Sequence, residues 1–259
     1  MSILGNVQRV LQLFAADTDD LSFTEAAARL DLPKSSVSHL LNQMTRYGLL
    51  DQHADTRRYR AGVLLGQAAR AAYSATPLDD ACRETLQDIS ARSGLTAYLS
   101  TLNGAETVVL QRLNGDTPVQ VLSSPGSRRA APGTAMGRVL LARLEPDELS
   151  ALYGTDPALA LPQTGRSGLA DVGALLRCLD EVRRTGHALV VDGAMPGIGA
   201  VAAAVRDPRD GELRGLCLSF SAARHADTAQ TQAWQRLLFD AVGALGRRLG
   251  DPAWRSAAP

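Results

Sequence analysis

One stretch decides the fold of the first quarter of this chain: Leu32-Pro33-Lys34-Ser35-Ser36-Val37-Ser38-His39-Leu40-Leu41. Apolar residues recur in it every three or four positions, which places them on one face of an α-helix; they are Val37, Leu40, Leu41 and, just beyond it, Met44. A second face carries only small or hydrogen-bonding side chains, at Ser35, Ser38, His39 and Asn42. Such side chains let a helix lie deep in a DNA major groove and hydrogen-bond to base edges or phosphates. The stretch therefore predicts the recognition helix of a helix-turn-helix.

The residues on either side complete this motif. Ser22-Phe23-Thr24-Glu25 is a capping box that begins a short, alanine-rich helix. Pro33 suits the first turn of the recognition helix, where its missing N–H would be unpaired in any case, and Gly48 ends that helix. The next residues predict a basic two-stranded wing, with one strand beginning at Leu49 and a returning strand at Arg57-Arg58-Tyr59-Arg60. The arginines of this wing would hold phosphates or enter a minor groove.

Positive charge is concentrated around this motif, although the 259-residue chain as a whole has zero formal net charge. Residues 29–70 contain seven arginines or lysines against three aspartates. Such a local excess of cations is the electrostatic footprint of a phosphate-binding surface. The residues that we expect to contact DNA are Thr24, Lys34, Ser35, Ser36, Ser38, His39, Asn42, Arg46, Arg57, Arg58, Tyr59 and Arg60.

The rest of the chain predicts an α+β fold, in which helices flank a largely antiparallel sheet. Alternating apolar residues and Asn-Gly turns indicate strands at 96–102, 108–113, 119–122, 187–191, 200–205 and 213–221. Helical periodicity and capping residues indicate helices at 78–93, 134–144, 171–184 and 227–249. Residues 125–133, which contain two prolines and two glycines, are not expected to form regular structure.

We therefore expect four parts: a winged helix-turn-helix domain at 1–61, a linker helix at 62–77, a sensor domain at 78–250 and a disordered tail at 251–259. No apolar run approaches the ~18 residues needed to span a bilayer, and no signal peptide opens the chain. We expect a cytoplasmic protein. The three cysteines and four histidines are scattered along the chain, which predicts neither a disulfide framework nor a metal site.

Two motifs would indicate an enzyme in another context. Residues 197–202 match the dinucleotide-binding pattern G-x-G-x-x-A, but that site needs its third small residue inside a helix. Here the run ends in a turn at Asp207-Pro208 and is predicted to pair forward with another strand. Gly133-Thr134-Ala135-Met136-Gly137 has the outline of a nucleophile elbow with alanine in place of the serine. We expect no cofactor and no catalytic residue, and a nucleotide-cofactor oxidoreductase is the alternative interpretation.

Several runs of residues resemble the IclR family of bacterial transcriptional regulators, and the resemblance covers nearly the whole chain. In the first part these runs are 7–11, 32–41 and 58–62; in the second they are Gly126-Ser127-Arg128, 134–142 and Pro196-Gly197-Ile198. The resemblance implies a GAF-like sensor domain that binds a small effector, often an organic acid or an aromatic carboxylate, and carries oligomer contacts. The family usually has arginine where this chain has His39, which implies a weaker or differently read DNA contact.

A sheet face with a thiol and two hydroxyls is predicted on strand 213–221, because three apolar side chains alternate there with Cys217, Ser219 and Ser221. This face is either the solvent side of an antiparallel sheet or the floor of a ligand pocket, and the helix start at Thr134 could offer backbone N–H groups to a carboxylate. The resemblance favours the pocket and adds the loop from Asp192. The effector-binding residues that we expect are Gly133, Thr134, Ala135, Met136, Asp192, Ala200, Cys217, Ser219 and Ser221.

Three positions of this expected pocket depart from the family pattern. Asp192-Gly193 stands where paired acids are common, Ala200 where cysteine is frequent, and Pro132 where histidine is frequent. The pocket should therefore be less polar than usual, which predicts an effector with a sizeable apolar or aromatic part.

Together these observations predict a non-catalytic, ligand-responsive transcriptional regulator that binds a palindromic operator as a dimer or a dimer of dimers. The effector would favour one arrangement of the sensor domains. A further alternative is a DNA-binding protein whose sensor half has lost its ligand.

Overall fold

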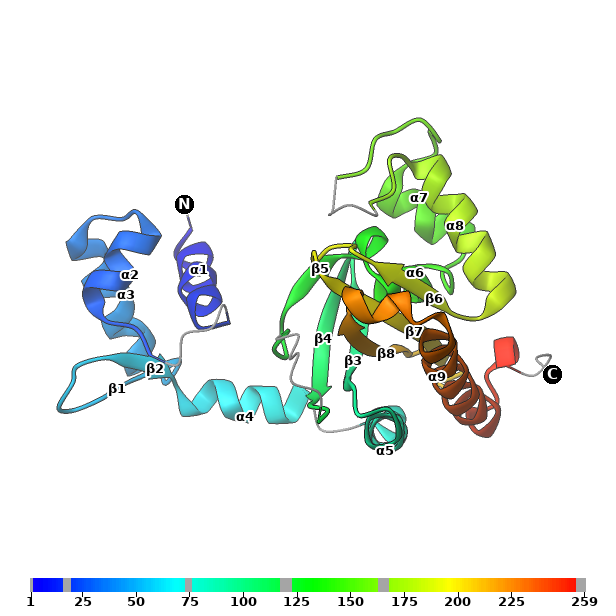
Figure 1. Cartoon of the computed structure of the whole chain (residues 1–259). Coiled ribbons are helices and arrows are strands. Elements are labelled where there is room, and N and C mark those ends of the chain that lie inside the picture. Colours follow the sequence, from blue (N-terminus) through cyan, green and yellow to red (C-terminus); the bar gives the residue numbers. More distant parts are fainter. Residues whose placement is uncertain (1, 16–19, 73–75, 117–122, 163–167, 255–259) are drawn as a thin grey trace. The chain divides into compact units, whose positions relative to one another are not determined.

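The computed structural model describes residues 2–15, 20–72, 76–116, 123–162 and 168–254. The chain folds into two compact units, Met1–Ser74 and Ala75–Pro259 (Figure 1). The linker helix expected at 62–77 is α4 (Val63–Ala72), and it groups with the first unit.

The first unit is a winged helix-turn-helix. Besides α4, it consists of α1 (Ile3–Ala15), α2 (Phe23–Leu30), α3 (Lys34–Arg46), β1 (Leu50–Gln52) and β2 (Tyr59–Ala61). The predicted capping box begins α2: the Glu25 N–H donates to Ser22 Oγ at 3.2 Å, and the Ser22 N–H donates to the Glu25 carboxylate at 2.7 Å. The two strands pair antiparallel and form the wing. Burial of the α3 stripe of residues 37–44 against α1, α2 and β1 closes a small core.

The second unit is built on a six-stranded antiparallel sheet. Its strands are β3 (Thr96–Asn103), β4 (Glu106–Leu113), β5 (Arg128–Ala130), β6 (Ala188–Val191), β7 (Ile198–Arg206) and β8 (Leu213–Ser221). They lie in the order β5-β4-β3-β8-β7-β6. The two middle strands, β3 and β8, are more than 100 residues apart in sequence, and Tyr98 lies opposite Cys217 in their register. The α+β architecture predicted from the sequence is confirmed.

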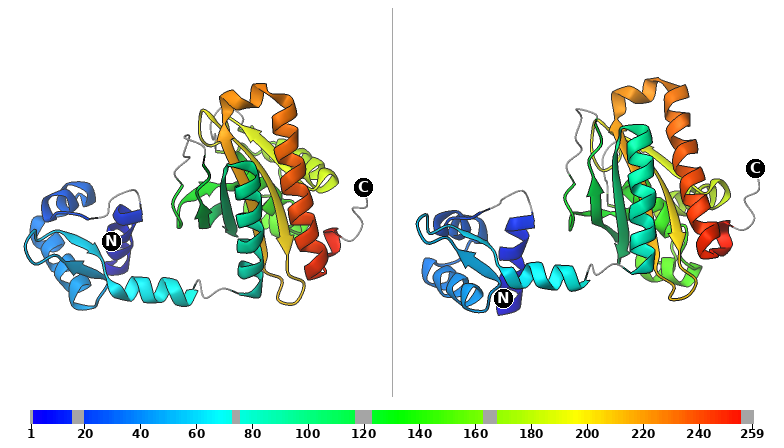
Figure 2. Two further views of the ribbon diagram at one scale, coloured as in Figure 1. Left: turned by 60° about the horizontal axis from the view of Figure 1, so that its bottom comes forward. Right: turned by 90° about the horizontal axis from the view of Figure 1, so that it is seen from below.

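Helices cover both faces of this sheet (Figure 2). The long helices α5 (Pro77–Ser93) and α9 (Thr228–Leu249) lie side by side on one face, over a core that includes Leu216 and Leu218. On the other face α6 (Ala135–Leu141), α7 (Pro146–Tyr153) and α8 (Val172–Thr185) pack over a core that includes Cys217. The alternation predicted for strand 213–221 therefore separates two cores.

Two elements differ from the sequence-based expectation. Residues 128–130, expected to be irregular, form β5, because the free edge of β4 supplies backbone partners that local sequence does not reveal: Thr107 pairs with Arg129. The helix α7 was not predicted, although Glu145 and Glu148 form a capping box around Pro146 at its start. The strand expected at 119–122 lies outside the described residues.

The prediction of a disordered tail at 251–259 is wrong for residues 251–254. Pro252–Trp254 form a 3-10 turn, and Asp251 and Trp254 are buried. The Trp254 ring packs against Phe239 of α9 with 5.0 Å between ring centroids, and its indole N–H donates to the Ala204 carbonyl at 3.0 Å. Tertiary contacts thus order a segment that has no strong local preference.

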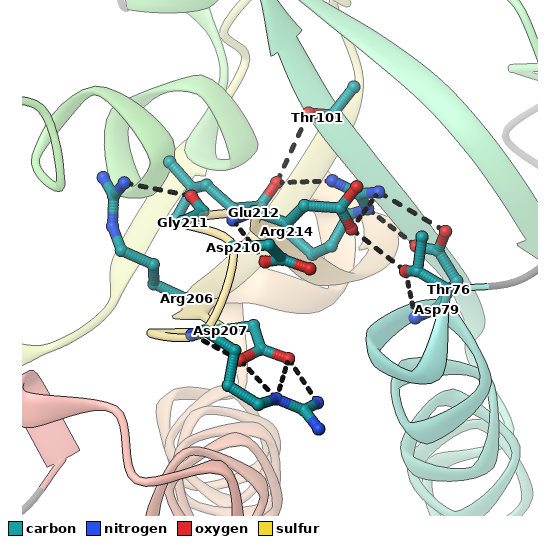
Figure 3. A network of polar contacts seen from close by, with 11 residues as sticks. Thr76, Asp79, Thr101, Arg206, Asp207, Asp210, Gly211, Glu212 and Arg214 are labelled. Atoms are coloured by element: carbon teal, nitrogen blue, oxygen red, sulfur yellow. Dashed lines mark hydrogen bonds and ion pairs between the residues drawn. The ribbon is translucent and has the colours of Figure 1, made fainter.

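Polar side chains connect the start of α5 with β8 and the turn before it (Figure 3). Arg214 donates through Nε to Asp79 at 2.7 Å and through Nη2 to Glu212 at 3.0 Å. Thr76, the N-cap of α5, donates to the same Glu212 carboxylate at 3.0 Å. The side chains of Arg214 and Asp79 are only 12% and 13% exposed, so salt screens this pair weakly. The first residues of α5 are thereby held to β8, one of the two middle strands of the sheet.

Candidate functional site

The polar face predicted for α3 lies on the outside of the first unit. Burial of the apolar stripe turns this face outward, so that Lys34, Ser35, Ser36, His39, Asn42 and Arg46 are exposed and Ser38 is half-buried. Thr24, in the first turn of α2, is exposed as well. The structure therefore leaves these side chains accessible to a groove of DNA.

Three exposed cations lie at the ends of α3 and on the wing. Lys34 begins α3, Arg46 ends it, and Arg57 lies at the turn of the wing. In the part of the chain that the structure describes, none of the three forms an ion pair. A guanidinium or ammonium group without a carboxylate partner is free to replace a counterion on a phosphate.

The other two wing arginines have partners in their own unit. Arg58 donates to Asp20 at 2.8 Å and to Glu25 at 3.0 Å, which ties the wing to the start of α2. Arg60 remains exposed, and its Nε lies 3.8 Å from the Asp51 carboxylate. The Arg58 side chain therefore contributes to the shape of the unit as well as to its charge.

Tyr59 does not lie on the surface with the other expected DNA contacts. It is only 6% exposed, and its ring packs in the core of the first unit. Its backbone N–H and carbonyl each bond to Leu21 at 2.8 Å. The expectation that Tyr59 contacts DNA is wrong, because its pairing with Leu21 turns the ring into the core while the next residue, Arg60, stays exposed.

The second unit contains a cavity of about 110 Å³ over the sheet face that carries Cys217. Most of the residues expected to bind an effector line it: Gly133, Thr134, Ala135, Met136, Ala200, Cys217 and Ser219. They come from the start of α6, from β7 and from β8, so the fold brings together three segments that are distant in sequence. Of the two interpretations of the polar face on β8, this arrangement favours a pocket floor over a solvent-exposed face.

Two expected residues, Asp192 and Ser221, do not line this cavity. Asp192 has a left-handed backbone (φ +53°), and its carboxylate accepts the Gly197 N–H at 2.6 Å. It therefore closes the loop before β7. Ser221 shares a strand face with Cys217 and Ser219, but it ends β8 opposite Ile198, beyond the last lining residue of that strand.

At the start of α6, one of the backbone N–H groups that could face a carboxylate is already bonded within the helix. Thr134 is its N-cap, and the Thr134 hydroxyl accepts the Gly137 N–H at 2.8 Å. The helix has only seven residues. Because the hydroxyl already satisfies a donor of the first turn, Thr134 serves the helix itself.

Sequence reasoning missed the side of the cavity formed by β3, β4 and β5. Its residues are Tyr98, Ser100, Thr107, Val109 and Arg129. Period-two alternation places Tyr98 and Ser100 on one face of a strand, but only the register with Cys217 shows which face that is. Arg129 lies in the segment that was expected to be irregular, so nothing in the local sequence assigned it a direction.

Most of the lining is apolar, and its thiol is not reactive. Burial raises the pKa of Cys217 to about 12 and that of Tyr98 to about 12, because burial disfavours the charged form. A thiol that stays protonated at neutral pH is a poor nucleophile. The Cys217 thiol is therefore a neutral, packed part of the lining.

These two pKa values predict a loss of stability at high pH. Both folded pKa values lie above the ordinary 9.0 of cysteine and 10.0 of tyrosine. The folded state then holds protons that the unfolded state releases, so the stabilisation is complete below pH ~9 and is lost as pH rises toward 12. The urea midpoint measured at pH 8, 10 and 11 should fall, and it should fall less for Cys217→Ala. Equal falls in both proteins would contradict the assignment to Cys217.

The dinucleotide-like run at 197–202 lies in a loop and on β7, which pairs with β8. It contains no helix, so the fingerprint of a nucleotide-cofactor site is missing from it. Packing explains one of its glycines, since a Cβ at Gly199 would lie 2.2 Å from the Phe220 ring. Among the described residues no group of histidine, cysteine and carboxylate side chains is placed to hold a metal ion. None of the described helices is long and apolar enough to cross a membrane.

Family models match both units of this chain. The IclR helix-turn-helix domain matches residues 4–54, and the C-terminal domain of bacterial transcriptional regulator IclR matches residues 70–246. The HTH-type transcriptional regulator XynR of Escherichia coli is 30% identical over 257 residues, which cover 98% of this chain and 100% of that protein.

Solved structures share the fold. The IclR of Thermotoga maritima superposes with a TM-score of 0.75 at 21% identity, over 95% of this chain and 98% of that one. An IclR homologue from Microbacterium hydrocarbonoxydans, complexed with 4-hydroxybenzoate, superposes with a TM-score of 0.77 at 22% identity, over 96% and 99%. At these identities the likeness establishes the fold alone.

Proposed function

This chain belongs to the IclR family of bacterial transcriptional regulators, which are DNA-binding proteins and not enzymes, and from that premise we propose that it binds a palindromic operator and responds to a small effector. The observation that carries the proposal is the pairing of two features in one chain. One is the exposed polar face of α3 with cations that form no ion pair among the described residues, and the other is the largely apolar cavity over β8.

DNA recognition is assigned to α3 and the wing. Ser35, His39 and Asn42 are exposed one to two turns apart on α3, the spacing at which one helix face reads neighbouring bases in the major groove. Lys34, Arg46 and Arg57 are assigned to phosphates. His39, in a position where the family usually has arginine, would offer a single hydrogen bond where arginine offers a fork of donors.

Effector binding is assigned to the cavity, with Gly133 to Met136, Ala200, Cys217 and Ser219 among its contacts. The related protein from Microbacterium hydrocarbonoxydans is complexed with 4-hydroxybenzoate, and a small organic acid with an aromatic or otherwise apolar part suits the lining seen here. No cofactor is required for such a response.

The regulator is proposed to act as a dimer or a dimer of dimers. Symmetric copies present two recognition helices to the two halves of a palindromic site. Effector would favour one arrangement of the sensor units, and α4 would convert it into a change of half-site spacing.

Fluorescence anisotropy with DNA from upstream of the protein's own gene tests the DNA-binding half of this proposal. The wild type is expected to bind specifically, with an affinity that falls steeply as salt is raised. The Ser35→Ala/His39→Ala variant should bind about 5- to 150-fold more weakly, because each of the two lost hydrogen bonds costs about 0.5–1.5 kcal/mol.

Arg92→Ala is the control for this experiment. Arg92 is an exposed arginine of α5 that pairs with Asp88 at 3.0 Å, and its removal should leave DNA affinity unchanged. Absence of salt-dependent binding by the wild type at low ionic strength would refute the proposed DNA-binding function.

A further inference from the structure

Arg129 contributes the charge of the effector cavity. Of the described residues that line it, this is the one with a charged side chain. Arg129 lies on the edge strand β5 opposite Thr107, whose hydroxyl donates to the Arg129 carbonyl at 3.3 Å. Its side chain is half-buried. Because β5 has only three residues and one neighbouring strand, its pairing with β4 determines the face of the sheet from which the Arg129 side chain projects.

The guanidinium of Arg129 has few partners among the described residues. Nη1 donates to the Arg128 carbonyl at 2.9 Å, and Nη2 lies 3.9 Å from the Met195 sulfur. A thioether is a poor acceptor, and a guanidinium has five N–H donors. Among the described residues, no carboxylate forms an ion pair with it.

Other arginines shielded from water in this unit are better satisfied. Arg143 pairs with Asp251 at 2.5 Å, and Arg214 pairs with Asp79 at 2.7 Å. Arg206 donates to the carbonyls of Arg143 and Gly211, at 2.7 and 3.1 Å. A partly desolvated charge is costly without a partner of opposite sign, and Arg129 differs from Arg143 and Arg214 in facing a cavity instead of a carboxylate.

We propose that Arg129 determines the specificity of the cavity by pairing with the carboxylate of the effector. A carboxylate accepts two parallel N–H bonds from a guanidinium, which gives direction as well as affinity. This inference rests on the proposed effector function and adds to it the residue that selects for charge.

The remaining lining limits the size and charge of the ligand. The cavity of about 110 Å³ is comparable to the roughly 150 Å³ cavity that holds one benzene molecule. Apolar side chains, among them Met136, Val190 and Ile198, surround this space. Since one cation lines it, a second carboxylate would lack a partner. The class of ligand selected is therefore a monocarboxylate with an apolar body about the size of one ring.

Titration calorimetry with benzoate and with benzamide, its uncharged isostere, tests this assignment on the full-length protein. The wild type is expected to bind benzoate at least tenfold more tightly than benzamide. In Arg129→Gln, affinity for benzoate should fall at least tenfold, and affinity for benzamide should stay within about twofold. Phthalate, with two carboxylates on the same ring, should bind the wild type more weakly than benzoate.

Arg128→Gln is the matched control, because Arg128 is the neighbouring residue of β5 but is exposed and pairs with Glu106 at 2.9 Å. It should preserve the preference for benzoate. Equal affinity of the wild type for benzoate and benzamide, or an equal loss in both variants, would overturn the role of Arg129. Failure of benzoate to bind a preparation that still binds operator DNA would overturn it too, and would leave the DNA-binding function standing.

Discussion

Replacement of Asp251 by alanine is expected to lower the free energy of unfolding of the second unit by about 3–5 kcal/mol, the range measured when one partner of a buried ion pair is removed. The Asp251 carboxylate is fully buried. It accepts from Arg143 Nη2 at 2.5 Å, from the Arg206 N–H at 2.8 Å and from the Ala253 N–H at 3.1 Å. Alanine would leave the Arg143 charge, which is 17% exposed, without a carboxylate partner, and it would leave two backbone donors without their acceptor.

Urea denaturation followed by tryptophan fluorescence measures this loss, since Trp234 and Trp254 are both buried in the second unit. Asp180→Ala provides the control. That carboxylate also pairs with an arginine, Arg183, but it is 72% exposed, and its removal should cost less than about 1 kcal/mol. If Asp251→Ala is too unstable to purify, Asp251→Asn retains the shape and should show a smaller loss of the same sign. A midpoint for Asp251→Ala equal to that of Asp180→Ala would refute the prediction.

The substitution Gly137→Ala is expected to destabilise the same unit by about 3 kcal/mol, the upper part of the usual range for overpacked sites. A Cβ at Gly137 would lie 2.0 Å from the Ala131 carbonyl oxygen and 2.4 Å from its Cα. These are backbone atoms, so no side-chain rotation relieves the clash. Either α6 or the 3-10 turn Ala131–Gly133 has to move, and both carry lining residues of the cavity.

Thermal and urea unfolding of Gly137→Ala measure this effect, and calorimetry with benzoate tests whether the cavity changes with it. Gly66→Ala is the comparison, because Gly66 lies in α4 and a Cβ there meets no atom within 4 Å. That alanine should stabilise its helix by up to about 1 kcal/mol. Wild-type stability in Gly137→Ala would mean that the close approach of α6 to residue 131 is not required.

Much of the fold could be predicted because its signals are local. The apolar stripe of α3, the capping box at Ser22 and the N-cap at Thr134 each involve residues within one or two turns of one another. Their geometry follows from helical periodicity and from the donors left open at a helix start. The same holds for β8, where alternation alone separates Leu216 and Leu218 from Cys217 and Ser219.

Other parts of the candidate site depended on contacts that no local pattern contains. The inward direction of Tyr59 follows from its pairing with Leu21. Tyr98 and Arg129 form one wall of the cavity because β3 pairs with β8 and β4, and β4 pairs with β5. Cross-strand neighbours come from any distance in sequence, and a shift of one residue reverses every side chain.

By itself, the sequence determined the helix-turn-helix, the α+β class and the polar face of β8, because short-range spacing is sufficient for each of them. Only the tertiary structure decided that Asp251 is a buried acceptor, and that Arg129 faces a cavity while Arg128 pairs with Glu106. The physical reason is that burial and charge pairing depend on which segments the sheet brings together, and that register is a property of the whole fold.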